Sequence, residues 1–191
     1  MTLRKTARQR PTLGASERGA AAAELVVILP IILTLVLGTI AIGTAYYYKL
    51  NLMEAAREGA RAGATLRTGY NPGGPEDRSG VPTNQWLLEV ANTATSTAGR
   101  WETVCVTYTG NVAFRPAGGT TTRTVNITNG GAPTYSGAPC FTDGRGATER
   151  RVQVVLTGTG PFSNFFFTQS ILNLETQALA RFQRPYTAVD L

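Results

Sequence analysis

A long uncharged apolar run near the N-terminus constrains the fold of this 191-residue chain more than any other feature. Residues 25–48 read LVVILPIILTLVLGTIAIGTAYYY, which is 24 positions without a charged side chain. As an α-helix this run would extend about 36 Å, longer than the roughly 30 Å hydrocarbon core of a bilayer. Apolar residues occupy every face of the predicted helix, which favours a membrane span over the buried core helix of a soluble domain.

The charges on either side of this run predict how the helix crosses the membrane. Residues 1–19 carry a net charge of +4, whereas residues 49–191, with 13 basic and 10 acidic residues, carry only +3 over a much longer stretch. Because lysine and arginine are retained on the cytoplasmic side, the N-terminus is expected inside and the C-terminal part outside. The basic tail is therefore interpreted as a topogenic signal, and nucleic-acid binding is not expected. A removable signal peptide is the alternative, although the apolar run is longer than the usual h-region.

The junction between the basic tail and the apolar run reads RGAAAAEL over residues 18–25. A carboxylate at the mouth of a membrane helix is costly unless it has a partner. A cut after Gly19 would create an α-amine on Ala20, four residues before Glu24 and on the same face of a helix. The amine and the carboxylate could then pair within one chain or between neighbouring helices. The alternative is that Glu24 only ends the membrane span.

This junction resembles the processing site of type IV prepilins, where a membrane peptidase cuts after a glycine and the fifth mature residue is glutamate. The segment AAREGAR at residues 55–61 follows the span. Together with the junction and Pro30, it resembles the TadE-like family of the tight-adherence (Flp-type) pilus system over about residues 18–66. In that family an aromatic residue often follows the glutamate, and Leu25 departs from this pattern.

The resemblance implies a minor pilin or pseudopilin that assembles a Tad/Flp-type pilus. It implies processing between Gly19 and Ala20 by a prepilin-type peptidase, with Glu24 and Pro30 as assembly residues. The implied partners are other pilus subunits, inner-membrane assembly proteins and the lipid bilayer, and the implied location is the bacterial cytoplasmic (inner) membrane. The alternative function is an unprocessed, single-pass membrane-anchored protein whose head binds a surface ligand or mediates adhesion.

Small residues are spaced along the predicted helix so that another backbone could approach closely. Thr39 and Gly43 form one pair at this spacing, Gly59 and Gly63 form another, and Ala56 lies on the same small surface. The expected contact is with neighbouring subunits or with the chain's own head, and simple helix propensity of alanine is the alternative. Pro30 removes a helical hydrogen bond and is expected to kink the helix.

The remaining sequence predicts an α+β head with an antiparallel sheet and a short helix. Apolar residues alternate in four segments, which is typical of strands, and the last segment could instead be helical. The expected strands are 101–108, 121–128, 150–157 and 172–182, after a short helix over 83–98. The expected division is a basic leader (1–19), a transmembrane helix (20–48), a helical stalk (49–67), a Gly/Pro loop (68–82) and the head (83–191).

The chemistry-bearing residues of the head indicate a structural or binding role. The chain has no histidine, which excludes Ser-His-Asp and Cys-His nucleophiles and histidine metal sites. The carboxylates have no spacing that pairs them, so no enzyme activity, cofactor or metal is expected. Cys105 and Cys140 both lie on the predicted outer side, where disulfides persist, and we expect them to pair rather than remain free thiols. The phenylalanine cluster of residues 162–167 is either a partner surface or a buried lid.

Overall fold

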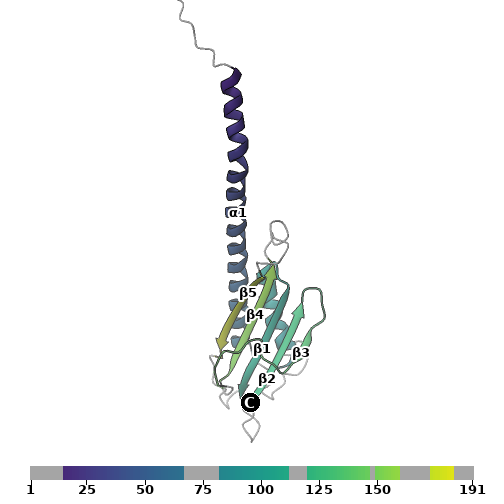
Figure 1. Cartoon of the computed structure of the whole chain (residues 1–191). Helices are drawn as coiled ribbons and strands as arrows, with labels where there is room; N and C mark the ends of the chain where they lie inside the picture. The colour runs from purple at the N-terminus through teal and green to yellow at the C-terminus, as the bar shows by residue number, and fades with distance from the viewer. Residues whose placement is uncertain (1–14, 67–81, 112–119, 147–148, 160–172, 183–191) are drawn as a thin grey trace, which may run out of the picture. The chain divides into compact units, whose positions relative to one another are not determined.

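The computed structural model describes residues 15–66, 82–111, 120–146, 149–159 and 173–182 (Figure 1). It divides into two compact units, residues 1–42 and 43–191. Most of the expected leader, nearly all of the Gly/Pro loop and the phenylalanine cluster lie outside the described residues. The separate leader, span and stalk therefore stay a prediction.

Helix α1 (Ala15–Thr65) is a single element of 51 residues that belongs partly to each unit. It runs through Pro30 and the uncharged apolar segment without a break in helical structure. The Thr34 hydroxyl donates a hydrogen bond of 2.7 Å to the Pro30 carbonyl. From Gly43 onward the helix forms part of the compact unit that contains the sheet.

The second unit is built on a five-stranded antiparallel sheet in the order β3-β2-β1-β4-β5 (Figure 1). The central strand β1 pairs with β2 from Thr103↔Thr128 to Asn111↔Thr120 and with β4 from Thr103↔Thr157 to Thr109↔Arg151. The sheet confirms the predicted α+β class. The strands are β1 (Thr103–Asn111), β2 (Thr120–Thr128), β3 (Thr134–Ser136), β4 (Arg151–Thr159) and β5 (Asn173–Arg181).

The segment that could have been a strand or a helix is strand β5. Leu174 and Ala178 are buried, whereas Glu175 and Gln177 between them are exposed. This period of two matches the pleat of a sheet with one covered face. Strand β3 was not predicted, because its three residues are all exposed and offer no alternation of apolar and polar side chains.

Helix α2 (Asn84–Ala98) covers the same face of the sheet as the last turns of α1. Thr83 caps it, since its side chain accepts a hydrogen bond of 3.1 Å from the Trp86 backbone N–H. The buried face of α2 and the alternating apolar residues of the strands meet in one core. Its largest fully buried members include Trp86, Tyr108, Leu52, Leu87 and Leu156. Leu52 comes from α1, so the end of that helix is part of the core of the head.

Candidate functional site

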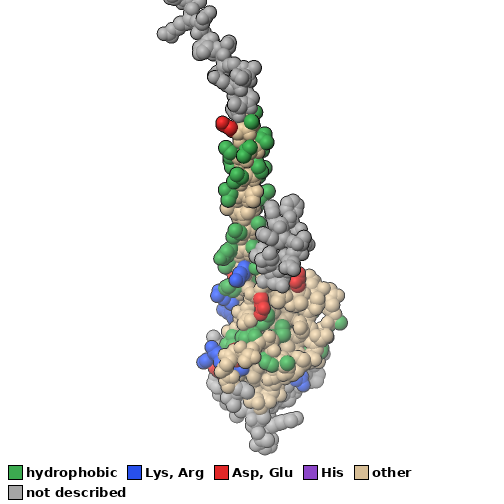
Figure 2. All heavy atoms as spheres, in the orientation of Figure 1, with side chains coloured by type: hydrophobic (Ala, Val, Ile, Leu, Met, Phe, Trp, Pro, Cys, Tyr) green, Lys and Arg blue, Asp and Glu red, His purple; other side chains and the backbone are tan. Residues whose placement is uncertain are grey.

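The part of α1 in the first unit carries large apolar side chains that are exposed. Between Leu25 and Ile42, its large apolar side chains are exposed by 43% (Leu37) to 69% (Val26). Figure 2 shows hydrophobic side chains along the visible side of this segment. Its most apolar 18 residues have a mean hydropathy of 2.9, and the helix is long enough to cross a membrane. Such a surface is compatible with lipid and unfavourable in water.

The predicted processing site lies near the beginning of α1. Gly19 and Ala20 are within the helix, which begins at Ala15, and Glu24 follows one turn after Ala20. The Glu24 side chain is exposed and makes no ion pair with any of the described residues. Ala20 and Glu24 therefore have the i, i+4 spacing of a helix, at which an amine and a carboxylate can pair.

The first pair of small residues lies on an open stretch of helix. A Cβ atom added at Gly43 would meet nothing within 4 Å. The Thr39 hydroxyl donates a hydrogen bond of 2.8 Å to the Val36 carbonyl, so its polar group is satisfied within the helix. Use of this pair as a packing surface for another helix stays a prediction.

The second pair of small residues contacts the head of the same chain. A Cβ atom at Gly59 would lie 2.6 Å from the Cβ of Ala94 on α2, and one at Gly63 would lie 2.9 Å from Val152 Cγ1 on β4. Ala56 is completely buried in the same core. The head is thus the partner that this small surface contacts, one of the two that the sequence suggested.

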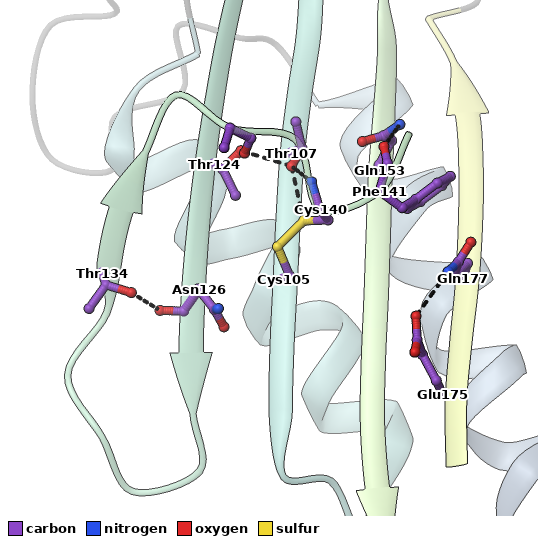
Figure 3. The surroundings of a disulfide bond; sticks show 11 residues. Cys105, Thr107, Thr124, Asn126, Thr134, Cys140, Phe141, Gln153, Glu175 and Gln177 are labelled. Carbon is purple, nitrogen blue, oxygen red and sulfur yellow. Dashed lines mark hydrogen bonds between the residues drawn. A yellow bond between two sulfur atoms is a disulfide. The ribbon is translucent and has the colours of Figure 1, made fainter. Parts of the chain in front are cut away.

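A disulfide joins Cys105 on β1 to Cys140, as predicted, with a Cα–Cα distance of 5.9 Å. Cys140 belongs to a segment that we call the strap, residues 137–146, which follows β3 and lies over the face of the sheet opposite the helices (Figure 3). Thr124 on β2 donates a hydrogen bond of 2.5 Å to the Ala138 carbonyl. The Cys140 backbone N–H donates one of 2.9 Å to the Thr107 hydroxyl on β1. The disulfide and these bonds attach the first half of the strap to two neighbouring strands.

The second half of the strap is attached to β4 through buried polar side chains. The Gln153 amide donates hydrogen bonds of 3.1 Å to the Phe141 carbonyl and to Asp143. Arg151 forms an ion pair of 2.8 Å with Asp143 and donates a hydrogen bond of 2.6 Å to the Gly146 carbonyl. Both side chains of this ion pair are less than 10% exposed, at 7% and 9%.

The protonation of Asp143 depends on these contacts. Burial by itself would raise the pKa of this carboxyl group. Hydrogen bonds from the Arg145 backbone N–H and the Gln153 amide, with the positive charge of Arg151, outweigh that effect and lower the pKa below its usual value. Asp143 is therefore held as a carboxylate, and it fixes the end of the strap.

The sequence did not reveal the polar anchors of the strap. The anchors are Thr107, Arg151 and Gln153. They occupy the polar positions of strands in which apolar and polar residues alternate, and such positions are ordinarily taken to face water. The one available signal was the presence of an arginine and a glutamine in β4, whose other residues up to Leu156 are all valine or leucine.

The comparison with known families concerns the N-terminal part of the chain. Residues 19–61 match the TadE-like protein family. The match begins at Gly19 and ends at Arg61, so it includes the junction, the apolar helix and the AAREGAR segment. It confirms, over this part of the chain, the resemblance to the TadE-like family found in the sequence. No curated protein and no solved structure matches the chain.

Proposed function

We propose that this chain is a minor pilin or pseudopilin-like structural subunit for assembly of a Tad/Flp-type pilus. The observation that supports it most is the exposed apolar helix that follows Glu24, which lies within the TadE-like match of residues 19–61. A helix of this kind is held by lipid before assembly and by other helices after it. This family has a structural role, so we assign the chain no catalytic activity.

Processing after Gly19 is the first step of the proposed function. The bond between Gly19 and Ala20 lies within α1, so a prepilin-type peptidase would have to unwind the first turns of the helix to reach it. Glycine costs a helix about 1 kcal/mol relative to alanine, which makes this the easier place to open. The new Ala20 amine would then supply the cation for Glu24.

The proposed orientation places the N-terminus in the cytoplasm and the head outside the bacterial inner membrane. The five basic residues of the leader support it, since such residues stay on the cytoplasmic side. The disulfide between Cys105 and Cys140 supports it independently, because disulfides persist in oxidising compartments outside the cytoplasm. The head would then meet other pilus subunits, and a surface ligand is a further partner.

The Glu24→Ala variant tests the assembly role separately from membrane insertion. In cells that produce the pilus, we expect a normal amount of the variant in the membrane, because removing a charge from a membrane helix does not hinder insertion. Its amount in sheared surface fibres and in membrane complexes with other subunits should fall about tenfold or more, as when one partner of a buried charge pair is removed.

The matched control is Glu175→Ala, which removes an exposed carboxylate from β5. We expect it to assemble like the wild type. Incorporation of Glu24→Ala at the wild-type level, with Glu175→Ala as reference, would contradict the assembly role of Glu24.

A further inference from the structure

We propose that the head holds a binding site for an oxyanion, a phosphate or carboxylate group, at the end of the sheet where α2 begins. The groups that bind it are the side chains of Arg150 and Arg123 and the hydroxyl group of Tyr108. The site rests on contacts within the head, and it is independent of processing after Gly19 and of membrane insertion.

The hydroxyl group of Tyr108 on β1 is fully buried and has no hydrogen-bond partner. It lies beside Gly110, because a Cβ atom added there would be 2.9 Å from the Tyr108 hydroxyl oxygen and 2.8 Å from Arg150 Cγ. The hydroxyl group therefore points along β1 towards the end of the strand and towards Arg150. A buried polar group without a partner is costly, and a bound ion is one arrangement that would satisfy it.

Trp86 in the first turn of α2 carries a second buried donor without a partner, its indole N–H. Its ring contacts that of Tyr108 edge to face, with 5.9 Å between the ring centroids. The ring of Phe182 lies 5.5 Å from that of Tyr108 and 6.2 Å from that of Trp86. Phe182 is only half-buried, so a rotation of its side chain would let a ligand reach the hydroxyl group.

The charges around these donors are positive. Arg123 is exposed, and its guanidinium group donates a hydrogen bond of 3.2 Å to the Pro82 carbonyl, directly before the Thr83 cap of α2. The helix N-terminus adds a partial positive charge, and the first turn of α2 contains no acidic residue. The charge of Arg150 lowers the pKa of Tyr108, but burial raises this pKa by more, so the hydroxyl group stays protonated and can donate.

Two acidic side chains from neighbouring segments are engaged elsewhere. Asp143 pairs with Arg151 at 2.8 Å, and Glu149 pairs with Arg181 at 2.6 Å. A guanidinium group matches the two oxygen atoms of a carboxylate or phosphate, and a phenol hydroxyl can donate to one of them. An oxyanion would therefore supply negative charge to the arginines and an acceptor to the buried hydroxyl group.

The test measures anion binding to the full chain in detergent micelles by isothermal titration calorimetry at constant ionic strength. The probes are inorganic phosphate and a tetraglutamate peptide, which distinguish a phosphate ligand from the carboxylates of a protein partner. The site variants are Arg150→Gln and Tyr108→Phe. Their matched controls are Arg100→Gln, just before β1 begins at the opposite end of the sheet, and Tyr135→Phe on β3, both at exposed positions.

We expect the wild type to bind at least one probe saturably and both controls to bind it equally well. Arg150→Gln should weaken binding about tenfold or more, because it removes a charge-assisted hydrogen bond. Tyr108→Phe should weaken it about threefold to tenfold, as expected for one neutral hydrogen bond.

Urea unfolding separates a binding role of Tyr108 from a structural one. Tyr108→Phe removes a buried hydroxyl group that has no partner, so without anion the variant should be at least as stable as the wild type. The bound probe should raise the urea midpoint of the wild type more than that of Tyr108→Phe, because ligand stabilises the folded state in proportion to its affinity.

Two results would overturn the proposal: no saturable binding of either probe to the wild type, or site variants that bind like their controls. Binding of phosphate alone would identify a phosphate ligand, and tighter binding of tetraglutamate would identify the carboxylates of a protein partner. None of these results bears on processing after Gly19 or on Glu24, so the proposed function would stand if the anion site failed.

Discussion

Adding one methyl group at position 59 tests how α1 packs on the head. In the interior of an ordinary helix, Gly→Ala is stabilising by about 1 kcal/mol. At Gly59, however, the new Cβ would lie 2.6 Å from the Cβ of Ala94 and 3.3 Å from its Cα. Carbon atoms pack at about 3.5–4.0 Å, so α1 or α2 must shift by about 1 Å.

The expected magnitude follows from these two opposing effects. Overpacking of a well-packed core costs about 1–3 kcal/mol, and the helix propensity of alanine returns about 1 kcal/mol. The net cost is therefore about 0–2 kcal/mol. Because Ala94 has no flexible side chain that could move aside, we expect Gly59→Ala to lie in the upper half of that range and to lower the free energy of unfolding by about 1–2 kcal/mol. Ala94→Gly should relieve the clash in the double variant, which we expect to be about 2 kcal/mol more stable than the sum of the single effects predicts.

The assay is urea unfolding of the full chain in detergent micelles, followed by tryptophan fluorescence. Trp86 is completely buried in the core, so its emission reports the loss of the head's packing. Gly43→Ala is the control, because a Cβ there meets nothing within 4 Å and should not destabilise the chain. A Gly59→Ala variant as stable as the wild type, or a double variant with no recovery, would refute the packing described for α1.

Two further predictions concern the strap. Cys105→Ser/Cys140→Ser should lower the free energy of unfolding by about 3–4 kcal/mol in a chain-entropy estimate for a sequence separation of 35 residues; an unchanged urea midpoint under the same conditions would contradict it. Asp143→Asn should destabilise the head by about 1–3 kcal/mol at pH 7, because Arg151 loses its counter-ion. Since the pKa of Asp143 is lowered on folding, its contribution is present above the unfolded pKa of about 3.9 and is lost as the pH falls further. The difference in unfolding free energy between wild type and variant should therefore shrink below about pH 4, and a constant difference down to pH 2 would show that the carboxylate charge is not the cause.

The sequence was most informative where a single pattern dominates the energetics. The uncharged run of residues 25–48 predicted a long apolar helix, because no charge interrupts it. Period-two alternation located four of the five strands to within a few residues, since each has one face in the core. The two cysteines were expected to pair, and the disulfide confirms it.

The sequence was least informative about contacts between distant segments. The small surface at Gly59 and Gly63 was equally consistent with a neighbouring subunit and with the head, because spacing alone does not identify a partner. The strap depends on Thr107, Gln153 and Asp143, which come from three separate segments. Their polar side chains are buried only because the strap crosses the face of the sheet opposite the helices. No local sequence pattern predicts that crossing.

The N-terminus of the native protein tests the central claim most directly. Intact-mass and peptide mass spectrometry of the chain extracted from its own membrane would determine it without any substitution. The proposed function predicts a chain that begins at Ala20, with Glu24 as its fifth residue. A chain that still carries residues 1–19 would contradict prepilin-type processing and favour an unprocessed membrane-anchored binding protein, and one beginning near Tyr46 would indicate a secreted head.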